Sequence, residues 1–316
     1  MELEQKLLSK WKNQMSNGYL HFNTIQNIVS NNSTKELIVN RNVSQSVDYV
    51  YSNLVTPRPK SVTNQKSSGR CWIFARLNMM RLPFMKKYEI SDFEFSQAYI
   101  FFYYKLETAN YFLNSILNLK ENGHQTPDKV NRILAHLLET PTCDGGQWDM
   151  LVSVIKKYGV VPKSVFQESR HSSSSGEMND IINTCLRTCA SKIWDDKILS
   201  HQDRLNIISN CMTNVYGNLL LFMGTPPNTF NWTYQSKSDK VMTVKDVTPC
   251  NFYNEYVKNV CDLDNYISII HDPRSQSTYG STYTVDYLGA IVGEKNKIFE
   301  HGHYKNKRIS KKIIVV

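Results

Sequence analysis

Apolar residues recur at helical spacing in the stretch that follows Ser67-Ser68-Gly69. Ile73, Leu77 and Met80 lie three or four positions apart, with further apolar residues between them. This period predicts a helix that is buried on most sides. Proline inside a helix removes a backbone hydrogen bond and crowds the preceding turn, so the pattern predicts that the helix ends at Pro83.

The same periodicity predicts that most of the middle of the chain is helical. Gly159 is a plausible stop for one of these helices, because glycine readily adopts the conformation that follows a helix end. Pro226-Pro227 breaks the last helical region, and a mixed region follows. The predicted helices cover 93–117, 126–140, 147–158 and 177–224. Strand-like runs occur at 266–270 and 282–285.

Breaks in the pattern divide the chain into four predicted segments. Thr56-Pro57-Arg58-Pro59 favours extended backbone, because a residue before proline is pushed away from helical geometry. The serine-rich run 171–176 is the best linker candidate. The predicted segments are 1–55, made of helices and connectors, then 56–170, 171–298 and a basic tail at 299–316.

Composition narrows the class of protein. Hydrophobic residues make up 41% and charged residues 21% of the 316 positions, as is usual for globular proteins. No apolar run approaches the ~18 residues of a membrane span, and the N-terminus lacks a signal-peptide core. We therefore expect a cytoplasmic protein without a membrane partner. Seven scattered cysteines, an odd number, agree with a reducing compartment.

The net charge of +9 raises the question of a nucleic-acid partner. The last fourteen residues carry five basic side chains and no acid. Because no nucleic-acid-binding motif accompanies this charge, we do not expect nucleic acid to be the main partner. His301 and His303 lack cysteine or carboxylate partners at ligand spacing, so we expect no metal site and no cofactor.

Cys71 stands where the first predicted helix begins. A helix N-terminus stabilises a thiolate through its unpaired amides and its dipole. Two groups could hold an oxyanion, the backbone amide of Cys71 and the side-chain amide of Gln65, six residues earlier. The alternative reading is that Cys71 is a small buried hydrophobe, which is common for free cysteines.

The run from Asn64 to Trp72, NQKSSGRCW, resembles the nucleophile motif of bleomycin hydrolases and bacterial aminopeptidase C enzymes, a family of papain-like cysteine peptidases. The likeness is specific and spans roughly residues 50–298. Further matching runs are 81–87, 93–97, 144–150, 157–163 and 272–274, together with Tyr253 and Val257-Lys258.

The resemblance implies an α+β fold of the papain-like cysteine peptidase type. The segment 56–170 would be the helical half that carries the nucleophile, and 171–298 a helical insert with the start of the second half. The C-terminal sheet domain would be largely missing. By position, Cys71 matches the nucleophile and Gln65 the oxyanion donor, while Gly145 and Gly146 match the glycines beside the substrate backbone. The alternative for the glycine pair is a tight turn before the next helix.

The family's catalytic histidine and its orienting asparagine lie far downstream of the cysteine. From about Phe299 the sequence no longer resembles the family, and the segments that would carry these two residues are not found. His201 and His271 are weaker candidates for the base, because neither has the expected setting. We therefore expect this chain alone to be inactive or nearly so.

The activity that the resemblance implies is thiol-dependent aminopeptidase action on peptides with a free N-terminus, through an acyl-enzyme. Family members also deamidate bleomycin and assemble as homohexameric rings. Two alternatives stay open: a non-catalytic isoform that binds full-length subunits, and an incomplete gene product.

Overall fold

The computed structural model describes residues 3–53, 56–121, 127–195, 199–236, 238–266, 282–283 and 304–305. The chain divides into two compact units, Met1–Val55 and Thr56–Val316. Each unit is described by itself. In the described ranges, no helix is long and apolar enough to cross a bilayer.

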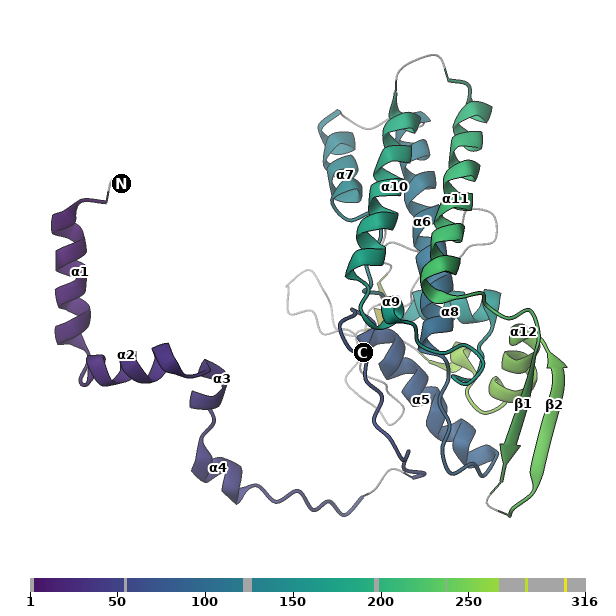
Figure 1. The fold of residues 1–316 in the computed structure, drawn as a ribbon, viewed down its shortest axis with the longest axis horizontal. Coiled ribbons are helices and arrows are strands. Elements are labelled where there is room, and N and C mark those ends of the chain that lie inside the picture. Colours follow the sequence, from purple (N-terminus) through teal and green to yellow (C-terminus); the bar gives the residue numbers. More distant parts are fainter. Residues whose placement is uncertain are drawn as a thin grey trace. The chain divides into compact units, whose positions relative to one another are not determined.

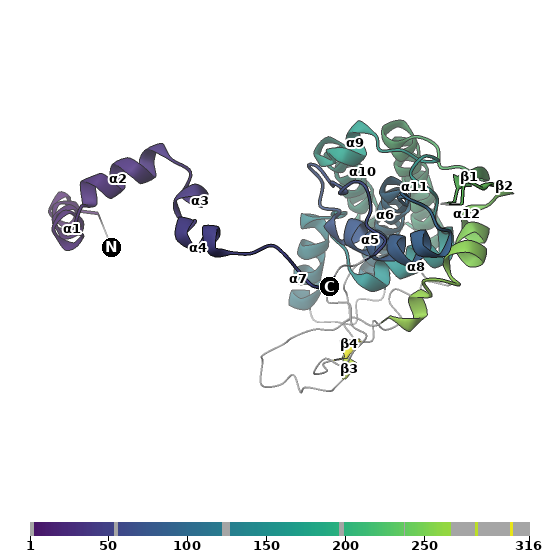
Figure 2. The ribbon, with the colours of Figure 1, turned by 90° about the horizontal axis from the view of Figure 1, so that it is seen from below.

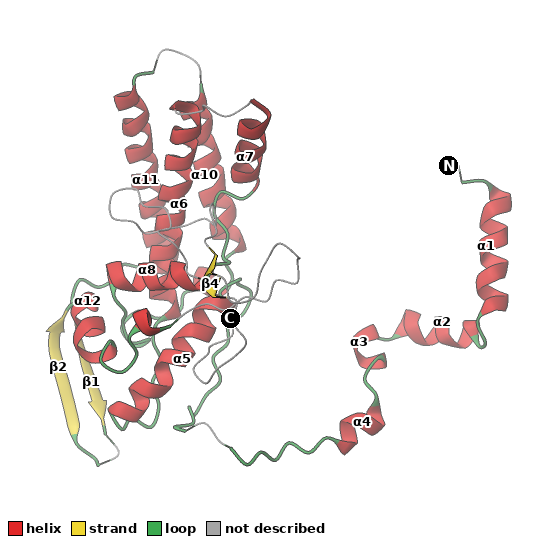
Figure 3. Ribbon diagram, turned by 180° about the vertical axis from the view of Figure 1, so that it is seen from behind, coloured by secondary structure: helices red, strands yellow, loops and turns green. Residues whose placement is uncertain are grey.

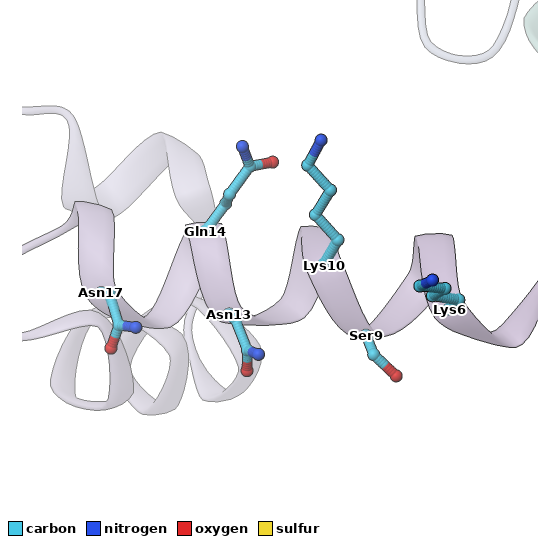
Figure 4. Close-up of a pocket in the computed structure, with 6 residues that line it drawn as sticks. All are labelled: Lys6, Ser9, Lys10, Asn13, Gln14 and Asn17. Atoms are coloured by element: carbon cyan, nitrogen blue, oxygen red, sulfur yellow. The ribbon is translucent and has the colours of Figure 1, made fainter.

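The first unit is a series of helices, and residues 3–53 include no buried side chain. Its elements are α1 (Gln5–Gly18), α2 (Phe22–Asn31), α3 (Thr34–Leu37) and α4 (Arg41–Ser46). None of these helices contains a buried residue. The Asn40 side chain caps α4 by accepting hydrogen bonds from the amides of Asn42 and Val43. One face of α1 is polar and lines a shallow surface hollow, as Figure 4 shows for Lys6, Ser9, Lys10, Asn13, Gln14 and Asn17.

The described part of the second unit is a helical assembly with two small two-stranded sheets. Its long helices are α5 (Cys71–Lys87), α6 (Gln97–Glu121), α7 (Pro127–Glu139), α8 (Trp148–Tyr158), α10 (Gly176–Trp194) and α11 (His201–Met223). The short helical elements are α9 (Arg170–Ser173), α12 (Pro249–Asn251), a π-helical turn (Phe252–Val257) and a 3-10 turn (Leu263–Asn265). The strands are β1 (Phe230–Gln235), β2 (Val241–Val247), β3 (Thr282–Tyr283) and β4 (Tyr304–Lys305). Both strand pairs, β1 with β2 and β3 with β4, are antiparallel.

Helix α6 is the centre of this unit. It contacts α5, α7, α8, α10 and α11, and Figure 2 shows these helices gathered around it. Apolar and aromatic side chains make up most of its buried positions, with Ile100, Phe101 and Phe112 almost fully excluded from solvent. Burial of a large apolar side chain contributes about 1.5–3 kcal/mol, so this face anchors the surrounding helices.

Helix α5 confirms the predicted helix at Cys71 but not its predicted end. It runs through Pro83 and ends at Lys87. A proline inside a helix costs about 3 kcal/mol, so packing must offset that cost. The residue after the proline, Phe84, is fully buried, with ring centroids 4.5 Å from Phe93 and 5.3 Å from Trp232. Tertiary burial therefore overrides the local preference.

The β1–β2 hairpin provides part of that packing, and no pattern in the sequence predicted this hairpin. Trp232 on β1 lies against Tyr88 and Phe252, with ring centroids 5.4 and 5.1 Å away. Figure 3 shows the two strands beside α12, at the side of the helical assembly. Of the predicted strand-like runs, Thr282–Tyr283 is strand β3, whereas 267–270 lies outside the described residues.

Helix α8 ends as predicted at Gly159, whose φ is +75°. A Cβ atom at this position would lie 2.1 Å from the backbone of Pro249.

The predicted linker at 171–176 is wrong, because this run includes residues of the short helix α9 and packed side chains. Ser172 and Ser175 are buried, and the amide of Ser67 donates to the carbonyl of Ser173 at 2.9 Å. The hydroxyls of Ser172 and Ser175 donate to the carboxylates of Glu168 and Asp144 instead of to water. The serine content of the run does not reveal these partners.

Candidate active site

Cys71 is the first residue of α5, and its side chain is exposed. The carbonyl of Arg70 accepts from the amides of Ile73 and Phe74, at 2.9 and 3.1 Å, and so begins the helical hydrogen bonding. The amides at a helix N-terminus have no partner within the helix, and together with the helix dipole they favour a negative charge nearby. The structure therefore confirms the predicted position of Cys71 and contradicts its reading as a buried hydrophobe.

Gln65 lies in the loop that leads to Cys71, and it is half-buried. Its Nε2 donates to the carbonyl of Ser68 at 2.7 Å, and the Ser68 hydroxyl donates back to the carbonyl of Gln65 at 2.7 Å. This reciprocal pair fixes the side-chain amide within the loop. An amide NH2 group has two hydrogens, so one donor of Gln65 stays available after the bond to Ser68 is made.

Arg70 anchors the same loop, because its Nε donates to the Ser68 hydroxyl at 2.8 Å, and no sequence pattern indicated this role. Its side chain is almost fully buried, and its guanidinium donates to both carboxylate oxygens of Glu168 at 3.0 and 2.9 Å. The guanidinium also lies over the rings of Phe74 and Phe101, 5.1 and 5.2 Å from their centroids. Burial lowers the pKa of Arg70, while the charge of Glu168 opposes that change.

Asp144 connects the nucleophile loop to the turn that contains the glycine pair. Its carboxylate accepts from the amide of Gly69 at 3.1 Å, from Asn179 Nδ2 at 2.9 Å and from the Ser175 hydroxyl. Lys105 Nζ lies 2.7 Å from the carboxylate, and the lysine side chain is fully buried. Burial alone would raise the pKa of Asp144, but Lys105 and the hydrogen bonds outweigh it and lower the pKa to about 2.

The turn itself packs against Trp72, the second residue of α5. Trp72 Nε1 donates to the carbonyl of Asp144 at 2.6 Å. Cys71 therefore stands between two residues, Gly69 and Trp72, that both hydrogen-bond to Asp144. Tyr104 of α6 adds a hydrogen bond from its hydroxyl to the carbonyl of Gly145. The start of α5 and the turn at 144–146 thus form one connected unit.

The two glycines have different surroundings. A Cβ atom on Gly146 would lie 2.6 Å from the Trp72 ring, whereas a Cβ atom on Gly145 would meet nothing within 4 Å. Packing alone explains why Gly146 is a glycine. Gly145 is exposed, and its backbone borders open space beside the start of α5.

This difference leads to a prediction on stability. We expect Gly146→Ala to lower the free energy of unfolding by about 1–3 kcal/mol, because the added methyl overpacks the site against Trp72. Gly145→Ala is the matched control and should change it by less than about 0.5 kcal/mol. Urea unfolding of both variants measures the difference, and equal values would contradict the close approach of Gly146 to Trp72.

Among the described residues, no histidine forms a hydrogen bond with Cys71. His201 Nδ1 lies 2.7 Å from the carboxylate of Glu121. The first turn of α11, the helix that begins at His201, is at the end of the helical assembly away from α5 (Figures 1 and 3). The ring of His171 packs on Phe222, with centroids 4.6 Å apart. His271, His301 and His303 lie outside the described residues.

Comparison with known proteins identifies the family. The Peptidase C1-like family matches residues 2–314, which extends past the predicted boundary at 298. Bleomycin hydrolase from Rattus norvegicus is 38% identical over 296 residues, 91% of this chain and 63% of that protein. Bleomycin hydrolase from Oryctolagus cuniculus is 40% identical over 271 residues, covering 85% and 96% respectively. Aminopeptidase C from Lactococcus lactis subsp. cremoris is 43% identical over 234 residues, covering 74% and 51%.

A solved structure shows the same fold. The crystal structure of PepW from Lactobacillus rhamnosis matches with a TM-score of 0.81 and 35% identity, over 92% of this chain and 64% of that one. The chain thus spans less than two thirds of the length of PepW and of the rat relative. The predicted resemblance and the α+β, papain-like fold class are confirmed. This chain belongs to the Peptidase C1-like family.

Proposed function

We propose that this chain takes part in thiol-dependent hydrolysis of peptides from a free N-terminus, with Cys71 as the nucleophile. The observation that carries the proposal is an exposed cysteine at the first position of α5, held between Gly69 and Trp72 against the turn at 144–146. The names of the relatives, bleomycin hydrolase and aminopeptidase C, support the reaction class.

In the proposed reaction, the Cys71 thiolate attacks the carbonyl carbon of the first peptide bond. The negative charge on the carbonyl oxygen would be held by the amide of Cys71 and the free donor of Gln65. The C–N bond then breaks, the amine leaves with a proton, and water hydrolyses the thioester to regenerate the thiol. The exposed backbone at Gly145 would lie beside the extended peptide.

The proton transfers need a general base, which we place outside the described residues. His171 and His201 have partners elsewhere. We propose that an imidazole, oriented by an asparagine, comes from a segment beyond the described helices or from another chain. The resemblance also supports a homohexameric assembly, and the scattered free cysteines support a cytoplasmic location, as further parts of the proposal.

The nucleophile can be tested separately from the base. An aminoacyl p-nitrophenyl ester has a leaving group that departs without a proton, so acylation of a thiolate needs no general acid. We expect the chain to release a burst of about one equivalent of nitrophenolate and to gain the aminoacyl mass on Cys71.

Two variants serve as controls for this burst. Cys71→Ala should abolish it, whereas Cys143→Ala, which removes the other exposed thiol, should retain it. An undiminished burst in Cys71→Ala would refute the assignment of the nucleophile.

A further inference from the structure

Three cysteine thiols converge between α10 and α11, away from the candidate active site. Cys185 and Cys189 are one helical turn apart on α10, so they share a face of that helix. Cys211 on α11 faces them, with its Sγ 3.9 Å from Sγ of Cys185. All three Sγ atoms lie within 4.8 Å of one another.

This spacing matches the sulfur set of a thiolate metal site. With a metal–sulfur distance of about 2.3 Å, two sulfurs on one ion lie about 3.8 Å apart in tetrahedral geometry and about 4.0 Å apart in trigonal geometry. The observed arrangement therefore needs only small rotations of the side chains. Isolated cysteines at helix interfaces pack as small apolar side chains, but that role does not require three sulfur atoms to meet at one point.

Access from solvent also favours an ion at this place. Cys211 is buried, whereas Cys185 and Cys189 are only partly buried, so the cluster has one side open to solvent. A bound cation would hold the sulfurs as thiolates while their protons pass to solvent. Lys192, whose charge acts on Cys189, would offset part of the resulting negative charge.

We propose that Cys185, Cys189 and Cys211 form a binding site for a soft closed-shell metal ion, Zn²⁺ or Cu⁺. Thiolate ligands select these ions over Mg²⁺ or Ca²⁺. A disulfide would join only two of the three sulfurs, at a bond length of about 2.05 Å. A metal ion engages all three and links α10 to α11. The site is independent of the proposed peptidase reaction, because none of its residues contributes to the start of α5.

The test uses the full chain with Cys71→Ala and Cys143→Ala in every sample, so that the two exposed thiols do not bind metal. Zn²⁺ is titrated against a chromophoric chelator, and Cu⁺ is titrated without oxygen against a copper(I) chelator. We expect about one equivalent of at least one ion to be bound. X-ray absorption of the loaded chain should show three sulfur atoms at about 2.3 Å.

Variants locate the site within the chain. Cys211→Ser should weaken binding at least tenfold, whereas Cys261→Ser should not, although Cys211 and Cys261 are equally buried at 1% exposure. Cys185→Ser, at a half-buried position, carries the test if Cys211→Ser does not fold by circular dichroism. Failure to bind either ion, or equal binding by the Cys185 and Cys261 variants, would overturn the proposal.

Discussion

Purified alone, the 316-residue chain is expected to hydrolyse aminoacyl-coumarin amides at a negligible rate, although its Cys71 can be acylated by an activated ester. An unassisted cysteine thiol, with a pKa of ~8.5, is only a few per cent thiolate at pH 7. An amine leaving group also needs a proton, which an imidazole normally supplies. General acid–base assistance is typically worth ~10²–10⁴-fold, so its loss raises the barrier by about 3–5 kcal/mol.

Fluorescence release from an aminoacyl-coumarin measures this rate, with the Cys71→Ala chain as the background. The two rates should be nearly equal. Robust turnover that Cys71→Ala removes would show that a base is already in place. His201→Ala and His271→Ala would then determine which histidine acts.

The second large effect is expected from Asp144→Asn. The substitution keeps the size of the side chain but leaves the fully buried Lys105 without a counter-charge. Breaking a buried ion pair from one side typically costs about 3–5 kcal/mol. We expect a loss of that size in the free energy of unfolding, measured with urea at pH 7.

Asp264→Asn is the matched control for this effect. Its partner Lys156 and Asp264 are both about half exposed, at 47% and 54%. Exposed pairs contribute about 0–1 kcal/mol, so the control should change stability little. Similar losses of unfolding free energy in the two variants would contradict the role of Asp144 as the counter-charge of the buried Lys105.

Because the pKa of Asp144 is lowered, the stabilisation from the Asp144–Lys105 ion pair depends on pH. Its pKa falls from 3.8 in the unfolded chain to about 2 in the folded one. A carboxylate with a depressed folded pKa contributes stability above pH ~4 and loses it as the pH falls toward 2. The wild-type chain should therefore lose roughly 2 kcal/mol more than Asp144→Asn over that range. Parallel curves for the two proteins would contradict the assigned shift.

Local patterns predicted much of this structure correctly. The helix at Cys71, the helical ranges at 126–140 and 147–158 and the stop at Gly159 all follow from spacing and from glycine chemistry within a few residues. Where long-range contacts determine the local structure, predictions from local patterns were wrong. Pro83 stays helical because Phe84 is buried in an aromatic cluster formed with the β1–β2 hairpin, far along the chain.

The candidate site shows the same division. Cys71, Gln65 and the glycine pair stand in recognisable motifs, so their positions could be predicted. Lys105, Arg70 and Glu168 could not, because a buried charge is identified only by its partner, and the partners are 39 and 98 residues away. The prediction of a linker at 171–176 was wrong for a related reason, because the polar side chains of this run hydrogen-bond to partners within the protein.

We propose that the start of α5 makes Cys71 the most reactive thiol of this chain. Brief treatment of the native protein with iodoacetamide, followed by peptide mapping, measures the labelling rate of all seven cysteines. The helix N-terminus favours the thiolate, which is the species that reacts. Labelling is expected to be fastest at Cys71, ahead of Cys143, which is also exposed, and well ahead of the partly buried Cys185 and Cys250. Slower labelling of Cys71 than of any of these three would contradict the claim.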